Sequence, residues 1–314
     1  MLVDGVWVGR FSPINTESQE HDGKGGFVRQ SSQFRDWVGR SERFPLEPGR
    51  YHLYVAMICP WACRTLMVRA LKGLESVISV SRISPGLSDQ GWTFKGWKSD
   101  PDPQFQSSYM HQLYTHADPR YSGRATVPVL WDKKHKTIVN NESADIMQML
   151  NRDFAPLAGN TLELRPAQLS EQIDFLGEYY YKNLNNGVYR AGFAQSQQAY
   201  EEAVTAVFES LEELEAALNT QRYRLGEQIT ELDLRLFVTL VRFELAYFSL
   251  FKCNLKSLQQ YPNICRYMQR IYNLPGIAET VDPEAIKRGY YSIETLNPTG
   301  IVPVGPGGLS FYKD

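Results

Sequence analysis

The feature that most constrains the fold is a strand–helix–strand pattern built around Cys59 and Pro60. Residues 51–57 have the aromatic and apolar composition of a strand. A helical pattern begins at Pro60 and is expected to stop at Gly73, and residues 77–83 predict a second strand. Two strands joined through a helix in this way should lie parallel, with a right-handed crossover.

A second group of elements follows in the sequence. Residues 127–131 and 137–139 predict the two strands of a hairpin, and a helix is expected from residue 143 to about 151. Residues 84–125, called the insertion below, are polar and aromatic with many turn signals, and unstructured insertions of this length tend to be functional. The order βαβ and then ββα is the thioredoxin-like arrangement.

From Pro166 onward the strand signals vanish and helical periodicity takes over. We expect helices over about 169–184, 196–218, 230–248 and 262–274. The expected fold class is therefore α/β plus all-α, with a thioredoxin-like domain followed by an all-helical domain. The expected boundaries are an N-terminal extension at 1–45, the thioredoxin-like domain at 46–160, the helical domain at 161–293 and a tail at 294–314.

Charge and composition narrow the function. The 314 residues carry 33 Lys and Arg against 35 Asp and Glu, which argues against nucleic acid or an anionic membrane as the main partner. No run approaches the ~18 apolar residues needed to cross a bilayer, and the first residues do not resemble a secretory signal. Four cysteines form no disulfide framework, so we expect a cytoplasmic protein. The glycine-rich stretch 21–26 lacks phosphate-loop spacing and is interpreted as a loop.

Cys59 is the strongest candidate for chemistry. It follows a predicted strand and precedes Pro60, a natural first residue of a helix, so it should be the N-cap. Unpaired backbone N–H groups and the helix dipole stabilise a thiolate there and lower the pKa of the thiol. We therefore interpret Cys59 as a nucleophile rather than as the buried structural cysteine that is the usual alternative.

The other cysteines do not suggest a dithiol or metal site. Cys63 gives the spacing Cys-Pro-Trp-Ala-Cys rather than CxxC, and a disulfide to Cys59 would need distortion. No histidine lies near this pair in sequence and no second CxxC exists, so no metal is expected. Cys253 and Cys265 fall in helical stretches and are interpreted as packing residues.

Two further motifs could bind a peptide-like thiol. Val127-Pro128 opens a strand, where thioredoxin-like folds have a cis-proline whose preceding backbone receives the main chain of the thiol substrate. Asn141-Glu142-Ser143 offers a carboxylate, a hydroxyl and helix N-terminal N–H groups, which could bind the amino-acid end of a zwitterionic peptide.

An ordered set of motifs resembles a known family over essentially the whole chain. The motifs are YHLYV at 51–55, CPWA at 59–62, GWTF at 91–94, YSGR at 121–124 leading into TVPVLWD at 126–132, NESA at 141–144, NNGVY at 185–189 and NPTGI at 297–301. In this order they resemble the glutathionyl-hydroquinone reductases, also called Xi-class glutathione transferases. The CPWA box alone is moderately specific, whereas the full set is very specific.

The resemblance implies roles for individual residues. Cys59 matches the family's nucleophile. The positions that match glutathione contacts are Trp92, Arg124, Ala125, Thr126, Val127, Glu142 and Ser143. Tyr189 matches the tyrosine that handles the proton of the quinol, and Tyr247 and Tyr290 match tyrosines that hold the substrate and lower the cysteine pKa. Cys63 is a departure, because the family usually has His after CPWA.

The resemblance also implies an activity, which is glutathione-dependent reduction of S-glutathionyl-hydroquinones by a homodimer without metal or nucleotide. Two alternatives stay open. One is an omega-like thiol transferase or dehydroascorbate reductase, which needs neither the three tyrosines nor the insertion. The other is a non-catalytic glutathione-fold binding module, although such modules usually lose the nucleophile.

Overall fold

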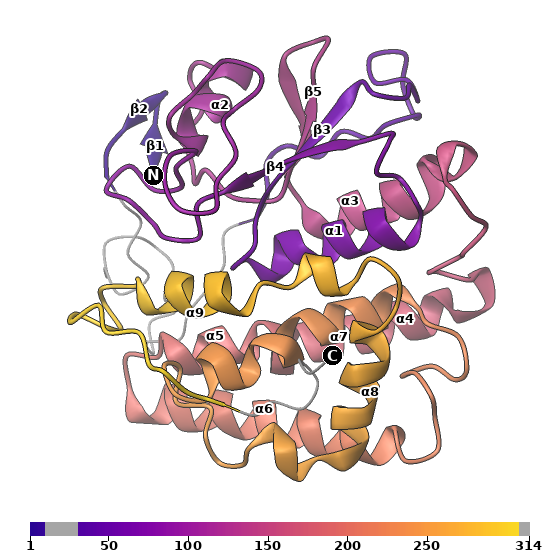
Figure 1. Ribbon diagram of the computed structural model, residues 1–314, viewed down its shortest axis with the longest axis vertical. Coiled ribbons are helices and arrows are strands. Elements are labelled where there is room, and N and C mark those ends of the chain that lie inside the picture. Colours follow the sequence, from indigo (N-terminus) through magenta and orange to yellow (C-terminus); the bar gives the residue numbers. More distant parts are fainter. Residues whose placement is uncertain (10–30, 308–314) are drawn as a thin grey trace. The chain divides into compact units, whose positions relative to one another are not determined.

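The computed structural model describes residues 1–9 and 31–307, so the predicted loop at 21–26 lies outside the described residues. These residues form two compact units, each described here by itself (Figure 1). The N-terminal unit comprises residues 1–9, 31–162 and 279–293, and the helical unit comprises residues 163–278 and 294–307.

A four-stranded mixed sheet forms the centre of the N-terminal unit. Its order is β4 (Ser79–Ile83), β3 (Tyr51–Ala56), β5 (Val129–Asp132) and β6 (Thr137–Asn140). β3 runs parallel to β4 and antiparallel to β5, which in turn pairs antiparallel with β6. The topology confirms the predicted βαβ and ββα order.

Two helices cover one face of this sheet (Figure 1). They are α1 (Pro60–Leu71) and α3 (Ser143–Gln148), which contact each other, and α3 continues into a π-turn at Met149–Asp153. All six residues of β3 are buried, as expected for a central strand covered on both faces.

The insertion covers the other side of β3 and is more ordered than the sequence indicates. It contains α2 (Met110–Ala117), which we did not predict because Tyr109 is an unusual N-cap that works here together with Gln112. Asp102 accepts a hydrogen bond from the Tyr54 hydroxyl of β3 at 2.8 Å, which attaches the insertion to the sheet.

The N-terminal extension also packs on this unit. β1 (Leu2–Val3) and β2 (Val6–Trp7) form a short hairpin. Further along, Arg35 forms a bridge with Asn140, and the Asp36 N–H donates to the Val139 carbonyl oxygen at 3.0 Å. The segment 32–36 therefore covers the exposed edge of β6, where unpaired backbone groups would otherwise remain.

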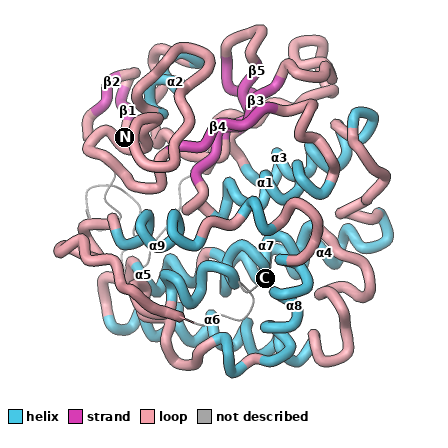
Figure 2. The backbone as a smooth tube through the Cα atoms, viewed as in Figure 1, coloured by secondary structure: helices cyan, strands magenta, loops and turns pink. Residues whose placement is uncertain are grey.

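The helical unit contains no strand in its described part, 163–278 and 294–307 (Figure 2). Two predicted caps are confirmed, since Ser196 accepts the Ala199 N–H and Thr230 forms a capping box with Asp233. Its helices are α4 (Ser170–Tyr180), α5 (Gly187–Gly192), α6 (Gln197–Ala217), α7 (Glu231–Arg242) and α8 (Pro262–Tyr272), with π-turns at Tyr181–Asn185 and Phe243–Tyr247. Short 3-10 turns cover Ala167–Leu169 and Leu258–Gln260 in this unit, Ala155–Leu157 in the N-terminal unit, and Ala278–Thr280 where the chain passes from one unit to the other.

A last helix, α9 (Pro283–Tyr291), was not predicted as an element. Asp282 caps it by accepting the Ala285 N–H at 3.0 Å. Although our expected helical domain extends to residue 293, α9 groups with the N-terminal unit, because Gly289 packs directly on Ile58. Across residues 1–9 and 31–307, no helix is long and apolar enough to span a membrane.

Candidate active site

Cys59 lies at the turn between β3 and α1. Its N–H donates to the Ala56 carbonyl oxygen at 2.9 Å, and its own carbonyl oxygen accepts the Cys63 N–H at 2.9 Å. Cys59 is the N-cap of α1 with Pro60 in the first turn, as predicted, and its side chain is half-buried. The sulfur is thus held at the positive end of a 12-residue helix.

The Cys59 thiol faces the start of β5. Its Sγ lies 3.7 Å from the Val127 carbonyl oxygen, to which the thiol donates. The Val127–Pro128 peptide is cis, which confirms the prediction made for this position. A thiol substrate paired with the Val127 main chain would therefore have its sulfur near Cys59.

Cys63 has different surroundings. It is fully buried, and its thiol donates to the Thr280 carbonyl oxygen at 3.2 Å. Cys253 is also fully buried, and burial raises the pKa of its thiol to about 12. All four cysteines, Cys265 included, are free thiols.

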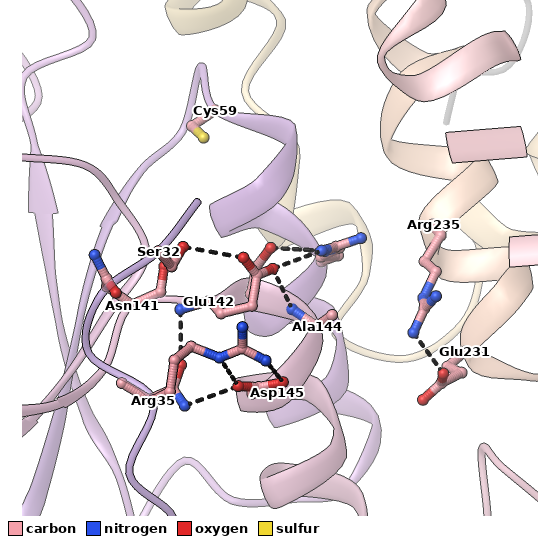
Figure 3. Close-up of polar contacts among 12 residues, drawn as sticks. Ser32, Arg35, Cys59, Asn141, Glu142, Ala144, Asp145, Glu231 and Arg235 are labelled. Carbon is pink, nitrogen blue, oxygen red and sulfur yellow. Dashed lines mark hydrogen bonds and ion pairs between the residues drawn. The ribbon is translucent and has the colours of Figure 1, made fainter. Parts of the chain in front are cut away.

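Glu142 is the N-cap of α3 and belongs to a second group of predicted site residues (Figure 3). Its Oε1 accepts the Ala144 N–H at 3.1 Å, and its Oε2 accepts the Ser32 hydroxyl at 3.0 Å. The Arg64 guanidinium lies 3.7 Å from the same carboxylate. The carboxylate is therefore oriented from three sides while its side chain stays 31% exposed.

Arg64 is a site residue that sequence reasoning missed. It projects from α1, is 5% exposed and donates from Nε to the Ser143 hydroxyl at 3.1 Å. Arg64 thereby joins the helix that begins after Cys59 to the Glu142-Ser143 pair. A lone arginine in the otherwise buried, mainly apolar stretch 62–68 is the signal that could have revealed it.

A polar network behind Glu142 fixes the start of α3 (Figure 3). Arg35 pairs with Asp145, with Nη2 to Oδ1 at 2.9 Å, and Asn140 donates to the same carboxylate at 3.1 Å. Asn140 Oδ1 also accepts the Glu142 N–H at 2.7 Å. The segment 32–36, which sequence analysis assigned only to an extension, thus supports the candidate site.

The remaining predicted glutathione positions lie in the insertion and at Thr126, the residue after it. The Trp92 carbonyl oxygen accepts the Met110 N–H at 2.9 Å, and the Arg124 carbonyl oxygen accepts the Tyr121 hydroxyl at 3.1 Å. The Thr126 main chain hydrogen-bonds to the hydroxyl of the buried Tyr114. Ala125 lies between these two anchored residues. Arg124, Ala125 and Thr126 therefore lie directly before the cis peptide, whereas Trp92 lies earlier in the insertion, beside the start of α2.

Two of the predicted tyrosines lie together in the helical unit. The hydroxyl oxygens of Tyr189 and Tyr247 are 3.5 Å apart, and both rings pack on Phe251. Gly192 permits this packing, since a Cβ there would clash with the Phe251 ring. The two phenols form one aromatic, hydrogen-bonded cluster.

Tyr290, the third tyrosine, lies on α9 in the same unit as Cys59 and is 2% exposed. Its neighbour Gly289 contacts Ile58, the residue that precedes Cys59.

Among the described residues, no group of three or more His, Cys, Asp or Glu side chains could hold a metal ion.

Comparison with known proteins identifies the family. A model of the glutathione S-transferase N-terminal domain matches residues 58–153, and one of the C-terminal domain matches residues 197–270. The chain is 47% identical over 318 residues to glutathionyl-hydroquinone reductase YqjG of Escherichia coli, covering 97% of this chain and 94% of that protein. The chain belongs to the glutathionyl-hydroquinone reductase family, the Xi class of glutathione transferases.

Other members of the family and of related groups agree with this assignment. The crystal structure of glutathione S-transferase Xi from Phanerochaete chrysosporium has a TM-score of 0.90 at 44% identity, covering 93% of this chain and 96% of that chain. A glutathione-bound structure of YqjG from Escherichia coli has a TM-score of 0.88 at 45% identity, covering 98% of this chain and 96% of that chain. Glutathione S-transferase omega-like 2 of Schizosaccharomyces pombe is 44% identical, covering 93% of this chain and 97% of that protein.

Proposed function

We propose that this protein reduces S-glutathionyl-hydroquinones to hydroquinones at the expense of glutathione. The main support is the Cys59 thiol, which caps α1 and lies 3.7 Å from the Val127 carbonyl oxygen beside the cis peptide. Membership of the glutathionyl-hydroquinone reductase family supports the choice of substrate. Glutathione is the co-substrate, as the glutathione-bound structure of YqjG suggests.

In the first half-reaction the Cys59 thiolate attacks the sulfur of the glutathionyl group. A Cys59–glutathione disulfide forms and the bond between sulfur and the aromatic carbon breaks. The electron pair of that bond remains on the aromatic ring, which takes up a proton and leaves as the hydroquinone. Tyr189 supplies or relays this proton, with Tyr247 hydrogen-bonded to it at 3.5 Å.

In the second half-reaction a glutathione thiolate attacks the mixed disulfide. Oxidised glutathione leaves and the Cys59 thiolate is regenerated. The carbon–sulfur bond has then been reduced to carbon–hydrogen, while two glutathione thiols have been oxidised to one disulfide. No metal or nucleotide takes part.

We assign the binding roles as the resemblance implies. Glu142 and Ser143 bind the γ-glutamyl end of glutathione, since Glu142 offers an oriented carboxylate. The Val127 main chain pairs with the cysteinyl part. Tyr290 holds the substrate and lowers the Cys59 pKa. The other assigned glutathione contacts are Trp92, Arg124, Ala125 and Thr126.

The deciding experiment measures turnover of a panel of glutathionylated hydroquinones with glutathione, with hydroquinone release as the readout. Turnover of dehydroascorbate is measured under the same conditions. We expect preference for the glutathionyl-hydroquinones. Preference for dehydroascorbate would favour an omega-like activity, consistent with the Schizosaccharomyces pombe relative. Turnover of neither, with a Cys59 thiol pKa at its ordinary value, would favour a binding module.

We further propose that the enzyme is a cytoplasmic homodimer. The four free thiols, among them a nucleophile that must be reduced to act, suit a reducing compartment. The dimer follows from family membership. Sedimentation analysis of the full chain tests the dimer, and fractionation of the producing cells tests the compartment.

A further inference from the structure

Tyr114 lies at a junction between two segments of the N-terminal unit. Its hydroxyl oxygen is 3.0 Å from the Thr126 carbonyl oxygen, 3.2 Å from the Thr126 nitrogen and 3.1 Å from Asn141 Nδ2. Thr126 immediately precedes Val127, and Asn141 immediately precedes Glu142. The Tyr114 hydroxyl oxygen therefore joins the segment that leads into Val127 to the segment that leads into Glu142.

The hydrogen-bonding capacity of the phenol is fully used. A tyrosine hydroxyl has one donor and can accept two hydrogen bonds. Here it donates to the Thr126 carbonyl oxygen and accepts the Thr126 N–H and the Asn141 amide. The Thr126 hydroxyl, 3.2 Å from the same oxygen, can only share one of these positions. Tyr114 is fully buried, and burial raises the pKa of its phenol, so the hydroxyl stays protonated.

The surroundings hold the Tyr114 ring in place. It projects from α2, the helix of the insertion, and contacts the rings of Phe34 and Tyr121 with centroids 5.9 and 5.0 Å away. Tyr121 in turn donates its hydroxyl to the Arg124 carbonyl oxygen. Tyr121 follows α2 in the insertion, whereas Phe34 comes from the distant segment 32–36, so packing between the two segments helps to set the position of the hydroxyl.

We propose that Tyr114 is a positioning residue of the glutathione site, whose hydroxyl fixes the main chain at Thr126 relative to Asn141. This inference rests on the proposed function, which places Glu142 against the γ-glutamyl end and Val127 against the central cysteinyl part of the same tripeptide. It gives the insertion a role, because α2 supplies the side chain that holds both binding segments at a fixed separation. Tyr114 itself does not contact the reacting sulfur atoms.

The test compares Tyr114→Phe with wild type in glutathione affinity, measured by titration calorimetry on the full chain. Loss of the hydroxyl leaves buried N–H groups unpaired and lets the segments shift, so we expect about tenfold weaker binding. The KM for glutathione should rise by a similar factor while kcat at saturation changes little. Amide exchange at Thr126 should be slow in the wild type and faster in the variant.

Tyr51→Phe is the matched control. Tyr51 is also fully buried in the N-terminal unit and donates its hydroxyl to the Pro45 carbonyl oxygen at 2.6 Å, away from the binding segments. It should leave glutathione affinity unchanged. Unchanged affinity in Tyr114→Phe, an equal loss in Tyr51→Phe, or rapid Thr126 exchange in the wild type would overturn the inference. A wild type that binds glutathione but releases no hydroquinone would instead refute the proposed function, and the affinity comparison would still decide the role of Tyr114.

Discussion

Cys59 caps the start of α1 and Cys63 lies one turn into the helix, and their surroundings give them different chemistry. The N–H of Cys63 is already bonded to the Cys59 carbonyl oxygen, and its side chain is fully buried against Thr280. The Cys59 side chain is half-buried and lies before the first helical turn. Only Cys59 combines access with a position before the first helical turn, where the helix dipole favours a thiolate.

We therefore predict a one-cysteine mechanism. Cys59→Ser should abolish hydroquinone release, whereas Cys63→Ala should keep most of it. Mass spectrometry of enzyme treated with a glutathionyl-hydroquinone should show glutathione on Cys59. A competent Cys59–Cys63 disulfide together with an inactive Cys63→Ala variant would contradict this mechanism and require a dithiol one.

Tyr189 is expected to act in one half-reaction only. As the proton donor to the departing quinol, its hydroxyl acts only in the first half-reaction. Tyr189→Phe should slow that step by roughly 10²–10⁴ and leave reduction of the mixed disulfide nearly unchanged, as rapid-mixing kinetics of each step would measure. The control is Tyr200→Phe, which removes a hydroxyl bonded to the Lys252 carbonyl oxygen. Equal slowing of both half-reactions would reduce Tyr189 to a scaffold residue.

The position of α9 depends on a close approach at Gly289. A Cβ built on Gly289 would lie 2.5 Å from Ile58 Cδ1 and 2.7 Å from the Pro85 carbonyl oxygen. The second contact is with backbone, which cannot move aside as a flexible side chain can. The absence of a side chain at Gly289 thus lets α9 pack against the residue before Cys59, and this packing sets the position of Tyr290.

We predict that Gly289→Ala displaces α9 and lowers the free energy of unfolding by about 1–3 kcal/mol. Because Tyr290 moves with the helix, the first half-reaction should slow as well. Urea unfolding and single-turnover kinetics measure the two effects. Gly86→Ala is the control, since a Cβ there would meet only Ser292 Oγ at 4.0 Å. A variant as stable and as active as Gly86→Ala would refute the role given to this contact.

The buried His52 makes the free energy of unfolding of the protein depend on pH. Its side chain on β3 is 2% exposed and bonds to the Ser79 hydroxyl at 2.7 Å. Burial, assisted by the charge of Lys133, lowers the His52 pKa from 6.5 to about 4. Since the unfolded chain then binds more protons than the folded one, stability must fall as the pH falls from about 6.5 towards 4.

We predict that His52→Gln weakens this pH dependence. Between pH 7 and pH 5 the wild type should lose about 2 kcal/mol of unfolding free energy more than the variant. Urea titrations at a series of pH values measure the difference. His135→Gln is the control, because the His135 side chain is 46% exposed, and it should behave like wild type. Parallel pH curves for wild type and His52→Gln would show that other groups govern acid unfolding.

Features that depend on short-range interactions could be predicted from the sequence. Strand and helix periods, the caps at Ser196 and Thr230, and the Cys59-Pro60 turn all appear in the structure where predicted. Each arises from residues within a few positions of one another, so a local pattern is sufficient to specify it. The motif order over the whole chain was specific enough to indicate the family as well.

The distant residues that support the candidate site could be identified from the folded chain and not from the sequence. Arg64 reaches Ser143, Ser32 reaches Glu142, and Tyr114 joins Thr126 to Asn141. The hydroxyls of Ser32 and Tyr114 bond to partners more than ten residues away, so their roles depend on how β6, α2 and α3 pack. The same reason explains α9, whose placement depends on a glycine that fits against Ile58 and Pro85, two residues about two hundred positions earlier.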